Sequence, residues 1–128
     1  MTQINIEKEK ESSINAKEVV MEYIEAVNRK DFKSARSYVS DSVSYVGSMN
    51  KFDKAEPYLK YLEHLDLYLD IKKVFVDGDD VCEFHEIHLD TQPEPLLVCM
   101  WFHVDGGKIS SIRIVFDPRP FIQEKRAR

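Results

Sequence analysis

The chain has 128 residues, of which 43% are hydrophobic and 32% are charged, and its formal net charge is −5. A chain of this length forms one domain around a single core. No window of the sequence approaches the roughly 20 consecutive apolar residues of a membrane span. The 18 basic residues are spread among 23 acidic ones, which excludes the basic surface that nucleic acid binding requires. We therefore expect a globular protein whose partners include neither nucleic acid nor a membrane.

The two ends of the sequence differ from its middle. Residues 1–13 are polar, charged and without periodicity, which predicts a disordered leader. This leader has no apolar run of the kind a secretion signal needs, so a cytoplasmic location is expected. Residues 14–121 are expected to form the single domain, and residues 122–128 a basic tail. Cys82 and Cys99 have neither metal-site spacing nor the density of a disulfide framework, and are interpreted as buried free thiols.

The first half of the domain has helical periodicity. Asn15 and Glu18 resemble a capping pair that opens a first helix. Its apolar residues recur at helical spacing: Ala16, Val20, Tyr23, Ile24 and Val27. Asp31 is in position to cap a second, shorter helix, and a short strand over residues 42–46 follows it.

A third helix is predicted before the pattern changes. Asp53 and Glu56 form its capping pair. Its buried stripe comprises Ala55, Tyr58, Leu59, Leu62 and Leu65. From Asp70 onward the period falls to about two. This predicts four antiparallel strands, at about 70–77, 81–90, 96–105 and 108–117. Helices followed by a curved meander predict an α+β domain with helices on one face of the sheet.

This order of elements resembles the nuclear transport factor 2-like superfamily, in particular its SnoaL-like branch. The resemblance covers residues 14–121 and rests on VVMEYIEAVNRKDFKSARSYVSDSVSYV at the start and GGKISSIRIVFDPRPF at the end. The first segment looks like the family's opening helix pair, and the second like its closing hairpin. The resemblance implies a cone-shaped α+β barrel, with three N-terminal helices packed on a curved, mainly antiparallel sheet around an apolar cavity. It also implies a homodimer through the outer face of the sheet.

The resemblance does not extend to the ketosteroid isomerase mechanism. Those enzymes use a tyrosine on the first helix, an aspartate at the end of the first strand and a protonated aspartate on a later strand. Tyr23 matches the first position, but the other two fall on Val46 and Met100. Without a general base at Val46 this mechanism fails. Two interpretations of Tyr23 stay open: its phenol hydrogen-bonds a ligand carbonyl, or it is a core tyrosine with a satisfied hydroxyl.

The last strand carries two charges that suggest a site. SnoaL-like cyclases and limonene-type epoxide hydrolases place an acidic residue on a late strand facing the cavity, and Asp117 is the candidate here. If Asp105 and Lys108 flank a two-residue hairpin, Arg113 lies opposite Met100. Arg113 and Asp117 would then be the polar groups of an apolar cavity wall. A carboxylate in such a wall has a raised pKa, which suits acid or base catalysis.

A different register gives a different meaning to the same residues. A slip of one residue in the hairpin exchanges the two faces of the last strand and places Ile112, Ile114 and Phe116 inside. Asp117 would then pair with Arg119 or cap the strand end, and Arg113 would lie on the outer face. The sequence alone does not choose between the two registers.

The histidines and the remaining cavity candidates follow from strand alternation. His85 lies on the predicted inner face and is the third catalytic candidate, as a proton carrier. His85 and His88 lie on opposite faces, so a shared metal site is not expected. No GxGxxG or GxSxG motif occurs, and no cofactor is expected. The predicted ligand-binding residues are Tyr23, Tyr45, Val98, Met100 and Phe102.

The sequence supports two functions. The first is a pocket for an apolar, cyclic or oxygenated small molecule, with cofactor-independent isomerisation, cyclisation or hydration as its chemistry and Asp117 as acid or base. The second is a non-catalytic module of the same fold that binds a ligand or a protein. In the second, the outer sheet face, including Trp101 and His103, carries homodimer or partner contacts.

Overall fold

The structure, a computed structural model, describes residues 16–121. The capping pair at Asn15, the leader and the tail lie outside the described residues. A helix over residues 16–28 comes first. The other helices and the strands are α2 (Phe32–Ser37), β1 (Val39–Val46), β2 (Lys51–Phe52), α3 (Ala55–Leu65), β3 (Leu67–Asp77), β4 (Asp80–Leu89), β5 (Leu96–Asp105) and β6 (Lys108–Val115). A single helical turn over residues 119–121 ends the described chain.

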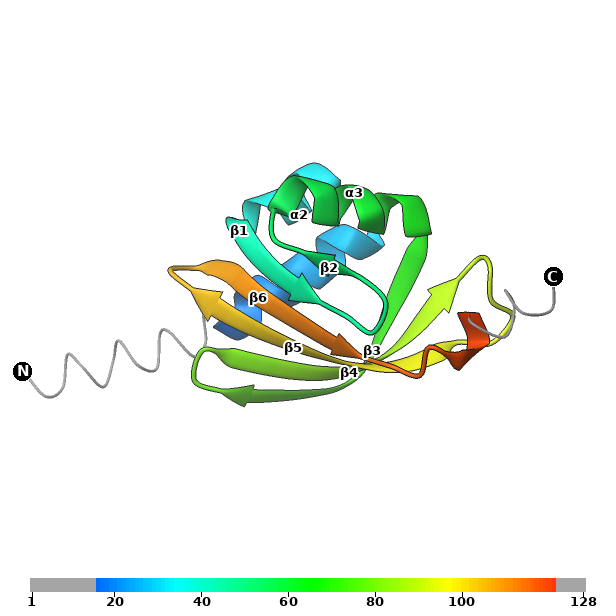
Figure 1. Ribbon diagram of the computed structural model, residues 1–128. Helices are drawn as coiled ribbons and strands as arrows, with labels where there is room; N and C mark the ends of the chain where they lie inside the picture. Colours follow the sequence, from blue (N-terminus) through cyan, green and yellow to red (C-terminus); the bar gives the residue numbers. More distant parts are fainter. Residues whose placement is uncertain (1–15, 122–128) are drawn as a thin grey trace, which may run out of the picture.

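The six strands form one mixed sheet in the order β2-β1-β6-β5-β4-β3. Strands β1 and β6 are parallel, and the other neighbours are antiparallel. The sheet is curved and does not close, and the three helices lie on one side of it (Figure 1). The predicted α+β class is therefore confirmed.

The joint between the first two helices depends on Asn28 and Asp31. The side chain of Asn28 donates to the Leu69 carbonyl at 2.9 Å and accepts from the Leu69 N–H at 2.8 Å, which fastens the end of the first helix to β3. Asp31 accepts from the backbone N–H of Ser34 at 3.1 Å, as predicted for the cap of α2. Lys30 lies in the turn between them and adopts a left-handed φ of 63°.

The start of α3 and the first strand differ from the prediction. Lys54, rather than Asp53, is the residue before the first turn of α3, and no side chain caps this end. Strand β1 begins at Val39, three residues before the predicted start, because it pairs with β6 from Ile109 onward. The short strand β2 was not predicted, since two residues are too few for a pattern.

The β5–β6 hairpin contains a bulge that sets the faces of β6. Asp105 and Lys108 flank the predicted two-residue turn, in which Gly106 and Gly107 have φ of 60° and 78°. The register then shifts: Val104 pairs with Ile109, but His103 pairs with Ser111. Ser110 is the extra residue of the bulge, and beyond it the two strands are offset by one position. Met100 therefore pairs with Ile114, and the predicted pairing of Met100 with Arg113 is wrong.

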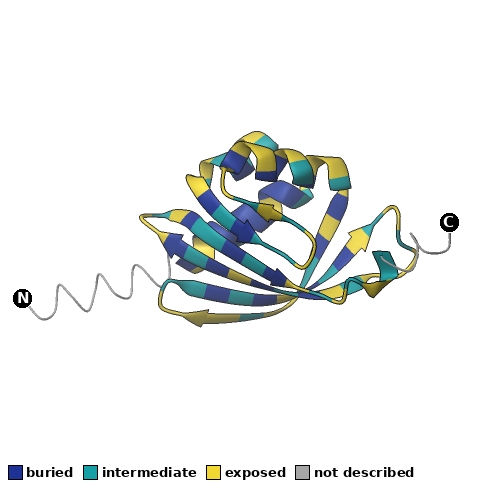
Figure 2. Cartoon of the chain, viewed as in Figure 1, coloured by how far each residue is buried: buried dark blue, intermediate teal, exposed yellow. Residues whose placement is uncertain are grey.

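The core lies between the helices and the inner face of the sheet. Buried residues alternate with exposed ones along β4, β5 and β6, so each strand has one apolar side facing the helices (Figure 2). On β6 the buried residues are Ile109, Ile112 and Ile114. Within residues 16–121, no helix is long and apolar enough to cross a membrane.

The bulge can be tested by two truncations on the same strand. Ile112 is 0% exposed and Val115 is 68% exposed. We expect Ile112→Ala to lower the free energy of unfolding by about 2 to 5 kcal/mol because it leaves a cavity. At a protein concentration low enough to keep the chain monomeric, Val115→Ala should change it by less than about 0.5 kcal/mol. Urea denaturation monitored by circular dichroism measures both. If Val115→Ala were instead the more destabilising of the two, Val115 would face the core and β6 would have the register without a bulge.

Candidate functional site

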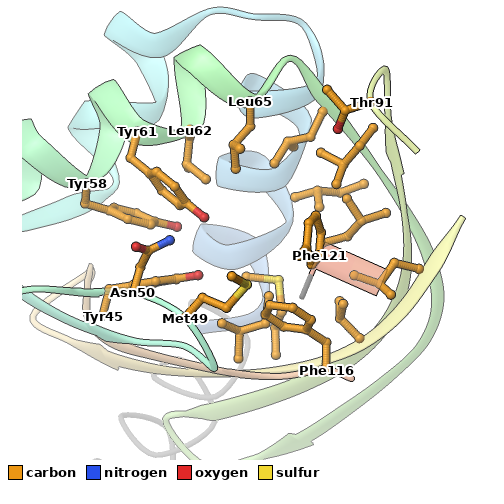
Figure 3. Close-up of a pocket in the computed structure, with 18 of the residues that line it drawn as sticks. Tyr45, Met49, Asn50, Tyr58, Tyr61, Leu62, Leu65, Thr91, Phe116 and Phe121 are labelled. Atoms are coloured by element: carbon orange, nitrogen blue, oxygen red, sulfur yellow. The ribbon is translucent and has the colours of Figure 1, made fainter. Parts of the chain in front are cut away.

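A cavity of about 220 Å³ lies between α3, the first helix and the inner face of the sheet (Figure 3). Most of its wall is leucine, isoleucine, valine, methionine and phenylalanine. The exposed residues Met49 and Thr91 belong to the wall, so the cavity opens to solvent on that side. Buried Tyr23 and Met100 belong to its closed end.

Four tyrosines form the polar part of the wall: Tyr23, Tyr45, Tyr58 and Tyr61. The hydroxyls of Tyr23 and Tyr58 are 2.5 Å apart and share a hydrogen bond. The rings of Tyr45 and Tyr58 stack with centroids 4.8 Å apart. In Figure 3 the side chains of Tyr45, Tyr58, Tyr61 and Asn50 gather on one side of the cavity. Asn50 also hydrogen-bonds the side chain of Tyr61. The cavity therefore has one hydrogen-bonding side in an otherwise apolar wall.

Burial keeps these phenols in their neutral form. Loss of hydration raises the pKa of Tyr23, Tyr45 and Tyr58 well above a tyrosine's usual range. Burial also raises the pKa of Tyr61, while its hydrogen bond with Asn50 lowers it. A neutral phenol donates a hydrogen bond, so these groups suit a ligand oxygen that accepts one.

The structure brings together four of the five predicted ligand-binding residues. Tyr23, Tyr45, Val98 and Met100 all belong to the cavity wall. Phe102 does not: it is fully buried in the core, where its ring packs edge-on against Tyr23 with centroids 6.1 Å apart. Tyr61 and Asn50 were missed, because neither a lone asparagine in a loop nor a tyrosine off the buried stripe of α3 gives a sequence signal.

Arg113 and Asp117 lie outside the cavity, so the prediction that they form its polar wall is wrong. The bulge at Ser110 is the cause, since it turns Arg113 to the outer face opposite Trp101. There Arg113 Nη1 donates to the Ser44 carbonyl at 2.8 Å. Asp117 is exposed and accepts from Arg119, with Oδ2 and Nη2 2.7 Å apart. This hydrogen-bonded pairing lowers the pKa of Asp117, the opposite of the shift that a catalytic acid requires.

His85 faces inward as predicted, but it does not line the cavity. It is 0% exposed, and its Nε2 lies 2.9 Å from Oε1 of Glu83, which is also 0% exposed. Glu83 was not identified from the sequence. Strand alternation contained the signal, because Glu83 and His85 are two residues apart and therefore share a face.

A cluster on the outer face has the composition of a metal site. Asp70, Glu86 and His88 place one potential ligand atom each within 4.8 Å of one another. Lys72 Nζ already lies 2.9 Å from Asp70 Oδ2 and 3.9 Å from Glu86 Oε1, so one ammonium group already offsets part of the negative charge of the two carboxylates. His85 and His88 are on opposite sides of β4, as predicted.

A curved mixed sheet covered by three helices, with an apolar cavity on its inner face, defines the structural class of this chain. Residues 20–112 match the model of the SnoaL-like domain family. The chain therefore belongs to this family, within the NTF2-like superfamily.

Solved structures agree with this assignment. An NTF2-like protein of unknown function from Cytophaga hutchinsonii is 26% identical, with a TM-score of 0.79 over 84% of this chain and 94% of that one. A candidate ketosteroid isomerase from Kribbella flavida is 14% identical, with a TM-score of 0.76 over 83% and 80%. An LEH-like epoxide hydrolase from M. tuberculosis is 19% identical, with a TM-score of 0.74 over 87% and 89%. No curated protein sequence matches this chain to a significant degree.

The buried phenols predict a specific response to alkali. An unfolded chain ionises its tyrosines near pH ~10. The pKa of Tyr23, Tyr45 and Tyr58 is raised in the folded state, so the folded chain keeps these protons and loses stability as the pH rises above that value. Phenolate absorbance should therefore appear in two phases, the later one coinciding with loss of the circular dichroism signal. In Tyr58→Phe the later phase should shrink by one tyrosine. Ionisation of all tyrosines without unfolding would contradict the burial.

Proposed function

We propose that the protein binds an apolar, cyclic or oxygenated small molecule in the cavity. The observation that carries the proposal is the wall itself: a cavity of about 220 Å³ with apolar sides and one group of neutral hydrogen-bond donors. Apolar walls provide affinity through the area they remove from water, and a few placed polar groups provide orientation. Carbonyl, ether and epoxide oxygens are the acceptors that such phenols suit.

The same wall favours binding over acid–base catalysis. Isomerisation, cyclisation and hydration each require a group that accepts a proton near neutral pH. The described residues that line the cavity include no aspartate, glutamate, histidine, lysine or arginine. The raised pKa of the tyrosines makes them hydrogen-bond donors rather than bases. Of the two functions expected from the sequence, the ligand-binding module therefore has more support than an enzyme that uses Asp117.

The similar structures provide weaker support for the ligand class. One is named as a ketosteroid isomerase candidate, one as an epoxide hydrolase and one as a polyketide cyclase candidate. Each is at most 19% identical to this chain, so they support the fold and leave the substrate open. Their names nevertheless indicate which compounds to test first.

The proposal predicts selective stabilisation by one chemical class. A ligand that binds only the native state raises the midpoint of thermal unfolding. We expect one class among steroids, polyketide-like aromatics, terpenoid epoxides and quinones to do so in a thermal-shift screen. Leu65→Trp, which adds volume at the cavity wall, should abolish the response. Asp117→Asn is the matched control outside the cavity, and it should leave the response unchanged.

The two variants also define the contrary result. If Asp117→Asn removes the response and Leu65→Trp does not, the ligand binds outside the cavity, at the chain end near Arg119. In that case the proposed site is wrong, whichever compound class is bound.

We also propose that a second copy of this chain covers the outer face of the sheet. Large apolar side chains on four neighbouring strands are exposed there: Phe75, Phe84, Leu97, Trp101 and Val115. An apolar patch of this kind marks an interaction site. It is also complementary to itself, which is what the two-fold symmetry of a homodimer requires, because the same patch of each subunit meets its copy.

Homodimer formation predicts a mass of twice 15.0 kDa in solution. Leu97 is 62% exposed and Val115 is 68% exposed, so Leu97→Glu with Val115→Glu should leave the fold intact. We expect this variant to elute as a monomer, because two buried carboxylates on each side of the interface would repel one another. Light scattering after size exclusion gives the mass. Lys60→Glu, on the exposed side of α3, controls for the added negative charge. A monomeric wild type would refute the interface.

A further inference from the structure

Glu83 and His85 form a fully buried pair with unused hydrogen-bonding capacity. Both side chains are 0% exposed, and Nε2 of His85 lies 2.9 Å from Oε1 of Glu83. Glu83 Oε2 and His85 Nδ1 are buried without a hydrogen-bond partner in the described part of the chain. A buried polar atom left in this state costs about 1 to 3 kcal/mol, so such atoms usually meet water or a ligand.

The two free atoms have complementary roles whichever group holds the proton. A buried pair avoids net charge when one proton is held between carboxylate and imidazole. If His85 is charged, Nδ1 is a donor and Oε2 an acceptor. If Glu83 holds the proton, one of the two free atoms still donates and the other still accepts. A hydroxyl group matches this set, because it donates one hydrogen bond and accepts another.

The pair borders the closed end of the cavity. On β5, Val98 lies opposite His85 and Met100 lies opposite Glu83, and both belong to the cavity wall. Ile87, the next inward-facing residue of β4 after His85, also belongs to it. Cross-strand neighbours on one face have Cβ atoms about 5 Å apart, so the pair lies directly beside side chains of the cavity wall. Met100 is the flexible one of these neighbours, since its unbranched thioether side chain changes rotamer easily.

We propose that Glu83 and His85 are a hydroxyl-binding subsite at the closed end of the cavity, reached when Met100 moves aside. This inference rests on the proposed function and specifies its ligand: an apolar alcohol or phenol whose hydroxyl enters first. The hydroxyl accepts from one of the two free atoms and donates to the other. The apolar remainder of the ligand fills the cavity towards the opening near Met49.

The test compares two probes that differ by one hydroxyl, β-naphthol and naphthalene, by equilibrium dialysis. We expect wild type to bind β-naphthol about tenfold more tightly, the value of one or two net hydrogen bonds. The double variant Glu83→Leu with His85→Leu should bind the two probes with equal affinity, and its affinity for naphthalene should match that of wild type. Replacing a buried ion pair by apolar residues of similar volume is often neutral for stability. Asp117→Asn, which lies outside the cavity, is the control, and it should bind both probes as wild type does.

Each contrary result has a distinct meaning. If the leucine variant still binds β-naphthol more tightly than naphthalene, the subsite is wrong and another part of the cavity wall holds the hydroxyl. Equal binding of both probes by wild type also refutes the subsite but leaves the cavity function standing. If neither probe binds, the cavity function fails for aromatic compounds, and the subsite fails with it.

A measurement on wild type avoids dependence on the folding of the leucine variant. The side-chain nitrogen resonances of His85 report hydrogen bonding at each ring nitrogen. We expect the Nδ1 resonance to shift on addition of β-naphthol and to stay in place with naphthalene. If the Nδ1 resonance does not shift at a saturating concentration of β-naphthol, the subsite is refuted.

Discussion

The bulge at Ser110 determines the chemistry of the cavity, because it decides which side of β6 faces inward. The turn at Gly106 and Gly107 starts the hairpin in one register, and the unpaired Ser110 moves everything after it by one position. Since side chains alternate with a period of two, this single residue sends Ile112 and Ile114 inward and Arg113 outward. The part of the cavity wall that was predicted to carry Arg113 and Asp117 is therefore apolar.

The polar groups of the cavity consequently come from elsewhere. Tyr45 reaches the cavity from β1, Tyr23 from the first helix, and Tyr58 and Tyr61 from α3. The Asn28 contacts with β3 fix the end of the first helix against the sheet. Stacking of Tyr45 on Tyr58 packs β1 against α3. The hydrogen-bonding side of the cavity is thus built at the places where helices contact the sheet, which makes it a rigid, preformed surface for a ligand oxygen.

The parts of the fold that were predictable are those with a repeated pattern. The α3 stripe and the alternation of β4 and β5 extend over several turns or residues, so a single exception does not hide them. The site depended instead on single events. The bulge residue Ser110 on β6 turns Arg113 to the outer face of the sheet, and a serine on a strand does not by itself predict a bulge. Glu83 was missed for another reason: alternation places it on the same face as His85, but a glutamate on a strand is normally solvated, so its residue type argued against burial.

The tyrosines of the cavity and the buried Glu83–His85 pair differ in what they contribute to the stability of the fold. The tyrosines bury mostly apolar rings, and a hydroxyl such as that of Tyr23 is satisfied by Tyr58, so this side stabilises the fold even without a ligand. The Glu83–His85 pair contributes less to stability, because two of its four polar side-chain atoms are buried without a hydrogen-bond partner in the described chain. Two apolar residues would pack there at lower cost. A pair that stabilises the fold so poorly is more readily explained by what it binds than by what it holds together.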